Sequence, residues 1–325
     1  MTSTNPSPVS RPVGVLYEHP EWFNPLFSEL DTRGIPYTPI DASTLVWDPA
    51  VTDLDYSVVI NRMSPSAWLR GNSSTIQSTA NYLDYLEGVG VPVINGSKAY
   101  AFEISKARQL RLLNELGVAH PKGRVVADAG HAVRAAKGLR YPVLIKPNVG
   151  GSGAGIVSFD TPESLDAAAT AGELDFGPDD TALVQEHLTA QDDAIVRVEF
   201  LGGEFLYGIR LRLTPGTFNL CPADYCDIVA TPDASAIRAP IEAFKPSPDI
   251  IRDAKRLLDA TGADLGGVEY LINEATGEAT FYDINALSNF VADAPTIIGF
   301  DPFVDLVDYI TKRAGIDGQA LASSW

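Results

Sequence analysis

The sequence predicts a parallel α/β layer over residues 12–97, followed by a mixed α+β region. In the first part, short apolar strands alternate with helical segments, which is the pattern of a parallel sheet covered by helices. After it the chain becomes β-rich, with strands close enough together to form long antiparallel hairpins. Of the 325 residues, 45% are apolar and 20% are charged, so the chain can bury a full core.

Residues 1–11 consist mainly of Ser, Thr and Pro, and we expect them to form a disordered tail. In the α/β layer, apolar runs predict strands, and periodic apolar positions predict two helices that end near Gly34 and Gly88. The segment Asn95–Ser97 is the first candidate domain joint. The expected strands are 13–17, 37–40, 57–60 and 92–94, and the helices lie near 22–33 and 75–87.

Beyond the joint we expect one helix over Tyr100–Leu116, ended by Gly117. Two further helices are predicted at 250–260 and 303–313 from their apolar spacing. The remaining apolar runs predict strands at 124–127, 142–146, 155–159, 182–187, 195–201, 204–213, 268–273 and 279–285.

Acidic residues outnumber Lys and Arg by 42 to 24, which gives a net charge of −18. This field repels phosphate backbones and anionic lipid, so we expect neither nucleic acid nor a membrane as partner. The N-terminus lacks the layout of a secretory signal, and Cys221 and Cys226 are too few for a disulfide framework. We therefore expect a cytoplasmic protein that acts on small molecules, and the sequence leaves a homo-oligomer open.

The strongest chemical signal is the glycine-rich loop after the strand that carries Lys146. Four glycines lie within residues 150–155, where the absence of Cβ atoms lets backbone N–H groups converge on a phosphate. The loop is followed by the β-branched segment Ile156–Phe159 instead of a helix, so it matches neither a P-loop nor a dinucleotide fingerprint. We interpret it as a flap between two antiparallel strands; an ordinary hairpin loop beside a surface lysine is the alternative.

A second signal is a predicted hairpin near the C-terminus. With a three-residue turn at Ala275–Gly277, Glu274 pairs with Glu278, and Glu269 then lies directly across from Asp283. Because side chains alternate along a strand, Asn285 shares the face of Asp283. Two carboxylates and an amide oxygen at one place suit Mg²⁺, and a solvated surface hairpin is the alternative.

Several cations are candidates for binding anions. Lys106 interrupts the apolar face of its predicted helix, where it either reaches an anion or extends its stem to solvent. Arg62 and Arg70 follow the strand 57–60, where ligands of α/β sheets bind, and could hold a substrate carboxylate. We expect Arg210 and Arg212 to form one patch with Arg197 on the neighbouring strand, unless these arginines only pair with surface carboxylates.

Together these segments resemble the ATP-grasp superfamily, most closely its RimK and glutathione-synthetase-like carboxylate–amine ligases. The resemblance extends from Val13 to Arg313. It depends on five segments in this order: Ile104–Lys106, Pro142–Pro147 with the glycine loop, Val184–Leu188, Tyr207–Arg210, and Gly267–Glu269 with Asp283–Asn285. The carboxylates are exchanged in length relative to the usual pattern, which has Asp at 269 and Glu at 283, and Ala286–Asn289 replaces the usual Ala-Asn-Pro-Gly.

The resemblance implies an ATP-grasp fold in three parts: a Rossmann-like pre-ATP-grasp domain at 12–97, a central subdomain with the flap at 98–183, and a C-terminal subdomain at 184–325. It also implies the sites. Catalysis would involve Lys146 and Arg210, and a substrate would be held by Arg62, Arg70 and Arg212. Glu269, Asp283 and Asn285 would bind Mg²⁺. ATP would be bound by Lys106, Lys146, Gly151, Ser152, Gly153, Gln185, Glu186, His187, Leu188 and either Asp192 or, as we prefer, Asp193.

The expected reaction joins a carboxylate, from an amino acid or small peptide, to an amine. ATP phosphorylates the carboxylate, the amine attacks the acyl phosphate, and ADP and phosphate are released. No protein nucleophile is needed, which fits the scattered histidines. An ATP-grasp enzyme with a non-amine acceptor and a catalytically silent ATP-binding protein are the alternatives.

Overall fold

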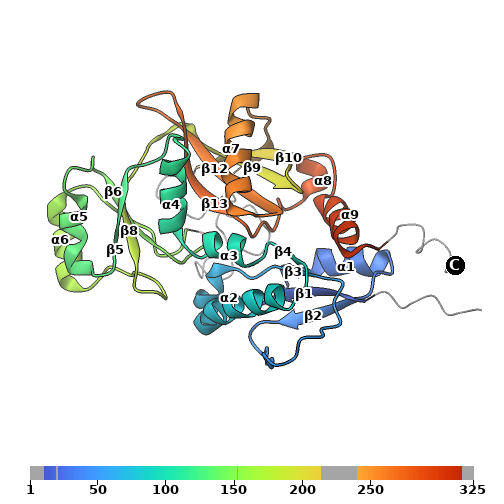
Figure 1. The fold of residues 1–325 in the computed structure, drawn as a ribbon. Coiled ribbons are helices and arrows are strands. Elements are labelled where there is room, and N and C mark those ends of the chain that lie inside the picture. Colours follow the sequence, from blue (N-terminus) through green and yellow to red (C-terminus); the bar gives the residue numbers. More distant parts are fainter. Residues whose placement is uncertain (1–10, 20, 152, 214–239, 317–325) are drawn as a thin grey trace, which may run out of the picture.

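The computed structural model describes residues 11–19, 21–151, 153–213 and 240–316. Three sheets follow one another along the chain, and Figure 1 shows helices on the faces of each. Most of the predicted tail, Ser152, Cys221 and Cys226 lie outside the described residues. Among the helices of the described part, none is long and apolar enough to cross a membrane.

The N-terminal sheet has the order β2-β1-β3-β4 and is parallel throughout, as the alternation of strands and helices predicts. Gly14 lies in close contact with Val59 and Ile40 on the neighbouring strands, so a larger residue would not fit there. Its elements are β1 (Val13–Tyr17), α1 (Asn24–Thr32), β2 (Tyr37–Asp41), β3 (Val58–Asn61), a 3₁₀ turn (Pro65–Arg70), α2 (Ser73–Gly88) and β4 (Val93–Ile94).

The central sheet is antiparallel, with the order β5-β8-β6-β7, and it has a small core of its own. Two helices complete this core, neither of which we predict from the sequence. The second begins at a capping box formed by Thr161 and Ser164, a local signal that identifies it in retrospect. The elements are β5 (Gly123–Val126), α5 (Ala132–Ala136), β6 (Val143–Pro147), β7 (Val157–Phe159), α6 (Pro162–Ala171) and β8 (Ala182–Glu186).

The C-terminal sheet is also antiparallel and has the order β11-β10-β9-β12-β13. Side chains at odd positions of β9 face the N-terminal sheet, whereas Val196, Val198 and Phe200 pack against α7 on the other face. The elements are β9 (Ala190–Leu201), β10 (Glu204–Arg212), β11 (Ile241–Ala243), α7 (Pro248–Thr261), β12 (Leu265–Asn273), β13 (Ala279–Asn285), α8 (Ala294–Ile297) and α9 (Pro302–Ala314).

The single helix expected over Tyr100–Leu116 is two helices in the structure. α3 (Ser97–Glu103) ends, and α4 (Lys106–Glu115) begins after Ser105, whose extended backbone and side-chain oxygen cap the new helix at Arg108 N–H. In addition, α4 packs against β13, and β8 remains in the central sheet up to Glu186. The core of the central sheet contains buried residues from Val126 to Val184, whereas Leu112 and Leu113 of α4 belong to the core beside the C-terminal sheet.

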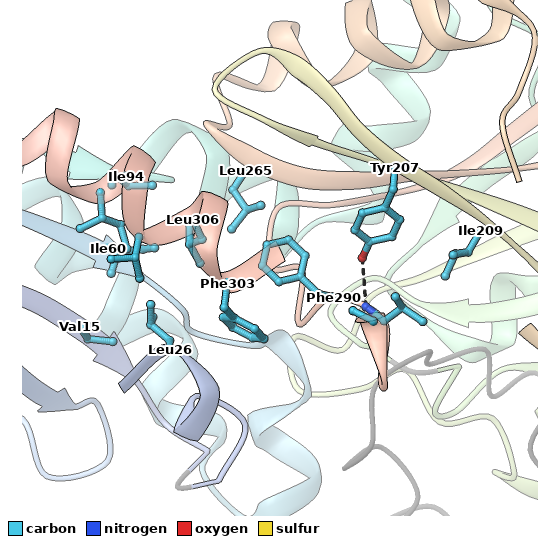
Figure 2. Packing of buried hydrophobic residues seen from close by; sticks show 14 of the residues in the cluster. Val15, Leu26, Ile60, Ile94, Tyr207, Ile209, Leu265, Phe290, Phe303 and Leu306 are labelled. Atoms are coloured by element: carbon cyan, nitrogen blue, oxygen red, sulfur yellow. Dashed lines mark hydrogen bonds between the residues drawn. The ribbon is translucent and has the colours of Figure 1, made fainter. Parts of the chain in front are cut away.

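One hydrophobic core joins the N-terminal and C-terminal sheets (Figure 2). Val15 and Ile60 of the first sheet share it with Leu265 of the last sheet and with Leu306 of α9.

Asn95, in the expected domain joint, is buried and holds these two parts together. Its side chain donates to Leu265 O (2.7 Å) and Ala286 O, and it accepts from Asp264 N–H (2.8 Å) and Leu265 N–H (3.0 Å). Asn95 therefore attaches the end of the N-terminal part to the C-terminal sheet through four hydrogen bonds.

Candidate functional site

Two lysines from different parts of the fold converge on one carboxylate. Lys106, the first residue of α4, lies 3.0 Å from Asp283 Oδ1, and Lys146 of β6 lies 3.1 Å from the same atom. All three side chains are buried or nearly so. Burial alone would raise the pKa of Asp283, but the two ion pairs outweigh burial and hold that pKa well below its usual range.

The break between α3 and α4 makes Lys106 the first residue of α4, beside Asp283. Asn148, two residues after Lys146, accepts from Ala107 N–H (2.9 Å) and from Ser105 Oγ (3.2 Å) through its side chain. Its backbone oxygen accepts from Lys106 N–H (3.1 Å). Asn148 thus fixes the two lysine segments relative to each other, a role that its position directly after Lys146-Pro147 could have indicated.

The carboxylate hairpin has the predicted pairing at its functional end, and Glu269 lies opposite Asp283. The turn itself differs from the predicted one, because Asn273, not Glu274, pairs with Glu278. A β-bulge restores the register, since Tyr270 pairs with Phe281 and the extra residue Tyr282 precedes Asp283.

Asn285 lies beside Glu269 as predicted and donates from Nδ2 to Glu269 Oε1 (3.2 Å). That contact does not use Oδ1 of Asn285. Burial and the neighbouring Asp283 carboxylate raise the pKa of Glu269, while Arg197 opposes them. Both carboxylates are therefore balanced by cations of the chain itself.

The residues present fit a magnesium ion. Glu269 and Asp283 supply two carboxylates and Asn285 an amide oxygen, and Mg²⁺ is commonly bound by one or two carboxylates together with phosphate oxygens of a substrate. In the described part of the chain, no group of three or more His, Cys, Asp or Glu side chains is placed to hold a metal. The metal would therefore need Asn285 and ligands from outside the chain.

Arg197 is more central than the sequence pattern predicts. It donates from Nε to Glu199 Oε1 (2.5 Å) and from Nη1 to Glu269 Oε1 (3.2 Å). Its guanidinium occupies the space above Gly267, where a Cβ atom would lie 2.7 Å from Arg197 Nε. Glycine at this position thus lets the arginine reach a proposed metal ligand.

The predicted patch of three arginines does not form. Arg197 pairs with Ile209 across β9 and β10, so Arg210 and Arg212 lie on the opposite face of the sheet. Arg210 stacks on Phe244 at 3.8 Å and pairs with Glu242 at 3.3 Å, and Arg212 is exposed and donates to Asp192 O (3.1 Å). The prediction that Arg210 acts beside Lys146 is therefore wrong for this structure, because strand alternation directs it away from the site.

Arg62 and Arg70 differ in their surroundings. Arg70 binds Glu18 through Nε (3.0 Å) and Nη2 and stacks over Trp22 (5.0 Å), so its charge is already paired. Arg62 is fully buried and donates from Nη2 to Ser288 O. Burial lowers the pKa of Arg62 to about 10. Of the two, only Arg62 has polar atoms left for a substrate, Nε and Nη1.

The glycine loop joins antiparallel strands β6 and β7, as predicted, and Gly153 and Gly155 both have φ of +72°. Gly151 lies against Ser66 in the 3₁₀ turn after β3, since a Cβ atom on Gly151 would be 3.5 Å from Ser66 Cβ. The loop therefore connects the central sheet to the 3₁₀ turn of the N-terminal part.

The proposed adenine segment lies where the chain passes from the central to the C-terminal sheet. Gln185 and Glu186 are buried at the end of β8, and Glu186 accepts from Arg140 N–H (2.9 Å). Burial lowers the pKa of His187, which lies 3.4 Å from Ser158 Oγ. Leu188 is half-buried, and Asp193, the fourth residue of β9, is exposed with φ of +47°.

Comparison with known proteins agrees with this geometry. The family model described as "Carbamoyl-phosphate synthase L chain, ATP binding domain" matches residues 105–192. A D-alanine--D-alanine ligase of Geobacter sulfurreducens is 26% identical over 271 residues, which are 78% of this chain and 77% of that protein. A second one, from Deinococcus radiodurans, is 28% identical over 233 residues, covering 68% of this chain and 64% of that protein.

Solved structures match over nearly the whole chain. D-alanyl-alanine synthetase A from Vibrio cholerae has a TM-score of 0.69 at 14% identity, covering 94% of this chain and 99% of its own. The ATP-grasp ligase PsnB complexed with a minimal precursor has a TM-score of 0.65 at 18% identity, covering 93% of this chain and 99% of its own. At such identities the likeness establishes the fold. Together with the matching family model and the curated relatives, it shows that the chain has the fold of ATP-grasp ligases and is similar in sequence to D-alanine--D-alanine ligases.

Proposed function

We propose that the chain uses ATP and Mg²⁺ to join a carboxylate to an amine through an acyl phosphate, with release of ADP and phosphate. The observation that carries this proposal is the convergence of Lys106 and Lys146 on Asp283, beside Glu269 and Asn285. Positive charge and hard oxygen ligands are thereby concentrated at one place, where β6 of the central sheet and α4 meet the C-terminal sheet. Phosphoryl transfer requires these groups, since catalysis there depends on positioning and electrostatic stabilisation.

The lysines and the flap would bind the nucleotide. Lys106 and Lys146 would hold phosphate oxygens, and backbone N–H groups near Gly151 and Gly153 would close over them. Gln185–Leu188 would meet the adenine, with Asp193 near the ribose. In support of this arrangement, the three segments belong to the strands and loops that border the same gap.

Glu269, Asp283 and Asn285 would hold Mg²⁺, which supplies neutralisation of phosphate charge when bound. For Asp283 to bind the metal, its ion pairs with Lys106 and Lys146 must break, and both lysines must then bind phosphate oxygens instead. Arg197 holds Glu269 from the opposite side and remains as its counter-charge. The chain therefore exchanges ion pairs among its own groups as the substrate arrives.

The carboxylate substrate would be an amino acid or a small peptide. Curated relatives are named as D-alanine--D-alanine ligases, and one structural relative is a ligase complexed with a precursor. These names support a zwitterionic or peptidic substrate. The protein would supply charge and orientation without a covalent intermediate on a side chain.

The test replaces the amine by hydroxylamine. Candidate acids are incubated with the protein, Mg·ATP and hydroxylamine, and hydroxamate is measured together with the nucleotide product. We expect hydroxamate and ADP in equal amounts, because hydroxylamine intercepts an acyl phosphate. AMP as the product would refute the mechanism, and ADP without hydroxamate for any acid would favour a kinase-like or silent role instead.

The same assay is carried out on a Lys146→Ala variant, which loses a proposed phosphate contact. The control is an exposed-surface change, Lys255→Ala, which removes a lysine whose ion pair in the described part of the chain is with Asp259 on the same helix. We expect hydroxamate formation to fall strongly in the first variant and to be unchanged in the second.

A further inference from the structure

Of the eight buried side-chain polar atoms without a hydrogen-bond partner in the described part of the chain, three belong to charged groups. They are Nε and Nη1 of Arg62 and Oε2 of Glu199. Each of these two side chains belongs to a residue that is only 1% exposed. Buried polar atoms are nearly always satisfied, so a cluster of unsatisfied donors and an acceptor of opposite charge calls for a ligand or an ordered water.

The two residues come from different sheets and face the same region. Arg62 follows β3 and contacts the loop after Asn285 through Ser288 O and Asn289 Oδ1 (3.4 Å). Glu199 lies near the end of β9 and is paired directly with Tyr207 on β10. Tyr207 in turn accepts from Val291 N–H (3.0 Å) of that same loop (Figure 2). Residues 288–291 therefore separate the two charges and touch the neighbours of both.

The charges of Arg62 and Glu199 influence each other, although the two side chains form no ion pair with each other. Burial lowers the pKa of Arg62, and the negative charges of Glu199 and Glu103 oppose that shift. None of the ion pairs among the described residues joins Arg62 to Glu199. Phe290, in the loop between them, has φ of +58°, an unusual conformation for an aromatic residue that costs energy and is found most often at functional sites.

We propose that Arg62 and Glu199 form the two ends of a subsite for the head group of an α-amino acid, with the carboxylate on Arg62 and the ammonium on Glu199. The inference rests on the proposed function and names the amine-supplying substrate for it. A guanidinium edge with two free N–H donors matches a carboxylate, and a carboxylate oxygen matches an ammonium. Arg197 already balances the charge of Glu199, whereas Arg62 pairs with no carboxylate of the described residues, so the carboxylate of the ligand would supply the missing counter-charge.

The orientation follows from Arg197. Its guanidinium joins Glu199 to Glu269, so the Glu199 end lies one side chain away from the proposed metal ligands. An ammonium bound there lies near the place where the acyl phosphate would form. Arg62 directly follows β3 of the N-terminal sheet, so the proposal assigns the carboxylate of the ligand to that end and the ammonium to the end nearer the metal ligands. The subsite thus distinguishes the amine of the acceptor from its acid group.

The experiment compares ligands that differ by one charge. Binding of common amino acids in both enantiomers is measured by calorimetry, with and without a non-hydrolysable ATP analogue and Mg²⁺. For the tightest amino acid, the corresponding amine without the carboxylate and the acid without the amino group are measured as well. We expect the amino acid to bind about 10- to 100-fold more tightly than either analogue, the usual range for a hydrogen bond to a charged group.

Isosteric variants assign each preference to its residue. In Arg62→Gln, the preference for the amino acid over the amine should disappear, while the preference over the acid remains. Glu199→Gln should show the reverse. Arg256→Gln, on the exposed face of α7, should retain both preferences. The comparison of ligands on the unmodified protein does not depend on whether the variants fold.

The inference is overturned if no amino acid binds, or if both preferences persist unchanged in the two variants. Binding of the ATP analogue and hydroxamate formation are measured on the same preparations. When these succeed and the amino acid preference is absent, only the subsite is wrong and an ordered water satisfies the buried atoms. When the nucleotide does not bind, the proposed function fails independently, and the measurements without nucleotide still decide the subsite.

Discussion

The ion pairs of Asp283 predict an unusual effect of removing its charge. Lys106 and Lys146 lie 3.0 and 3.1 Å from Asp283 Oδ1, so the lysines proposed to bind phosphate are paired with a proposed metal ligand. An ATP molecule without metal must displace Asp283 and leave its carboxylate unpaired. Mg²⁺ removes this cost because it takes over Asp283. Nucleotide and metal should therefore bind cooperatively, and Asp283→Asn should uncouple them.

The distances set the size of the effect. At an effective dielectric constant of about 20, two unit charges roughly 3 Å apart attract by about 5 kcal/mol before desolvation is considered. Removing one partner of a buried ion pair costs about 3–5 kcal/mol net. Glu103 and Glu269 also act on Lys106, so we expect a loss of about 3 kcal/mol in the free energy of unfolding of the nucleotide-free variant. A small part of that energy, about 1.4 kcal/mol, already gives a tenfold change in affinity.

The assay is calorimetric titration of ATP in EDTA and in excess Mg²⁺, with thermal unfolding measured in parallel. We expect Asp283→Asn to bind metal-free ATP at least about tenfold more tightly than the unmodified protein and to gain little from Mg²⁺. Asp259→Asn, which breaks the exposed pair with Lys255, serves as the matched control and should change neither quantity. Equal metal-free affinity in the variant and the unmodified protein, or an undiminished effect of Mg²⁺, would refute the reasoning.

Three further predictions follow from single side chains. Lys146→Ala should weaken ATP binding in calorimetry by about 10- to 100-fold with an unchanged circular dichroism spectrum, and an unchanged affinity would contradict its role. Burial raises the pKa of Glu103 from 4.5 to about 7. The folded state therefore binds the extra proton between these values, and stability falls as pH rises through this interval. Urea unfolding should show Glu103→Gln to be more stable than the unmodified protein at pH 8, by up to about 3 kcal/mol, with no such difference at pH 4; equal pH profiles would contradict this. Asn95→Ala should cost about 3 kcal/mol or more of unfolding free energy because it leaves buried backbone groups of Leu265 unpaired, and a loss under 1 kcal/mol would show that water replaces the amide.

Local patterns predict those parts of the fold that depend on nearby residues. The parallel order of the first sheet follows from alternating strands and helices, and the flap follows from glycines between two β-branched runs. The opposition of Glu269 and Asp283 also holds, although for a different reason than predicted. The turn is one residue longer on one side, and the bulge at Tyr282 compensates. Counting from the turn gives the correct pair only because these two irregularities cancel.

Features that depend on tertiary contacts are not visible in the local pattern. An apolar stripe runs from Phe102 through Leu113, but the helix breaks at Ser105 because Asn148, in another segment, binds the ends that the break exposes. Similarly, an arginine on β10 can be assigned to a face only when the register with β9 is known. Because a shift of one residue reverses every side chain of a strand, the local sequence does not show that Arg210 and Arg197 lie on opposite faces.

Arg62 and Arg70 show most clearly where the local sequence stops being informative. Both follow β3, both lie at the edge of the sheet where ligands bind, and nothing in the local sequence separates them. The structure separates them by a residue far from either in the sequence. Glu18, after β1, is buried and receives both Arg70 and Asn72 (2.6 Å), so a substrate would have to displace a paired charge to use Arg70. Arg62 meets no carboxylate within ion-pair distance in the described residues, and two of its donors remain free. Whether a charged side chain is available to a substrate therefore depends on which other residues of the packed fold already bind it.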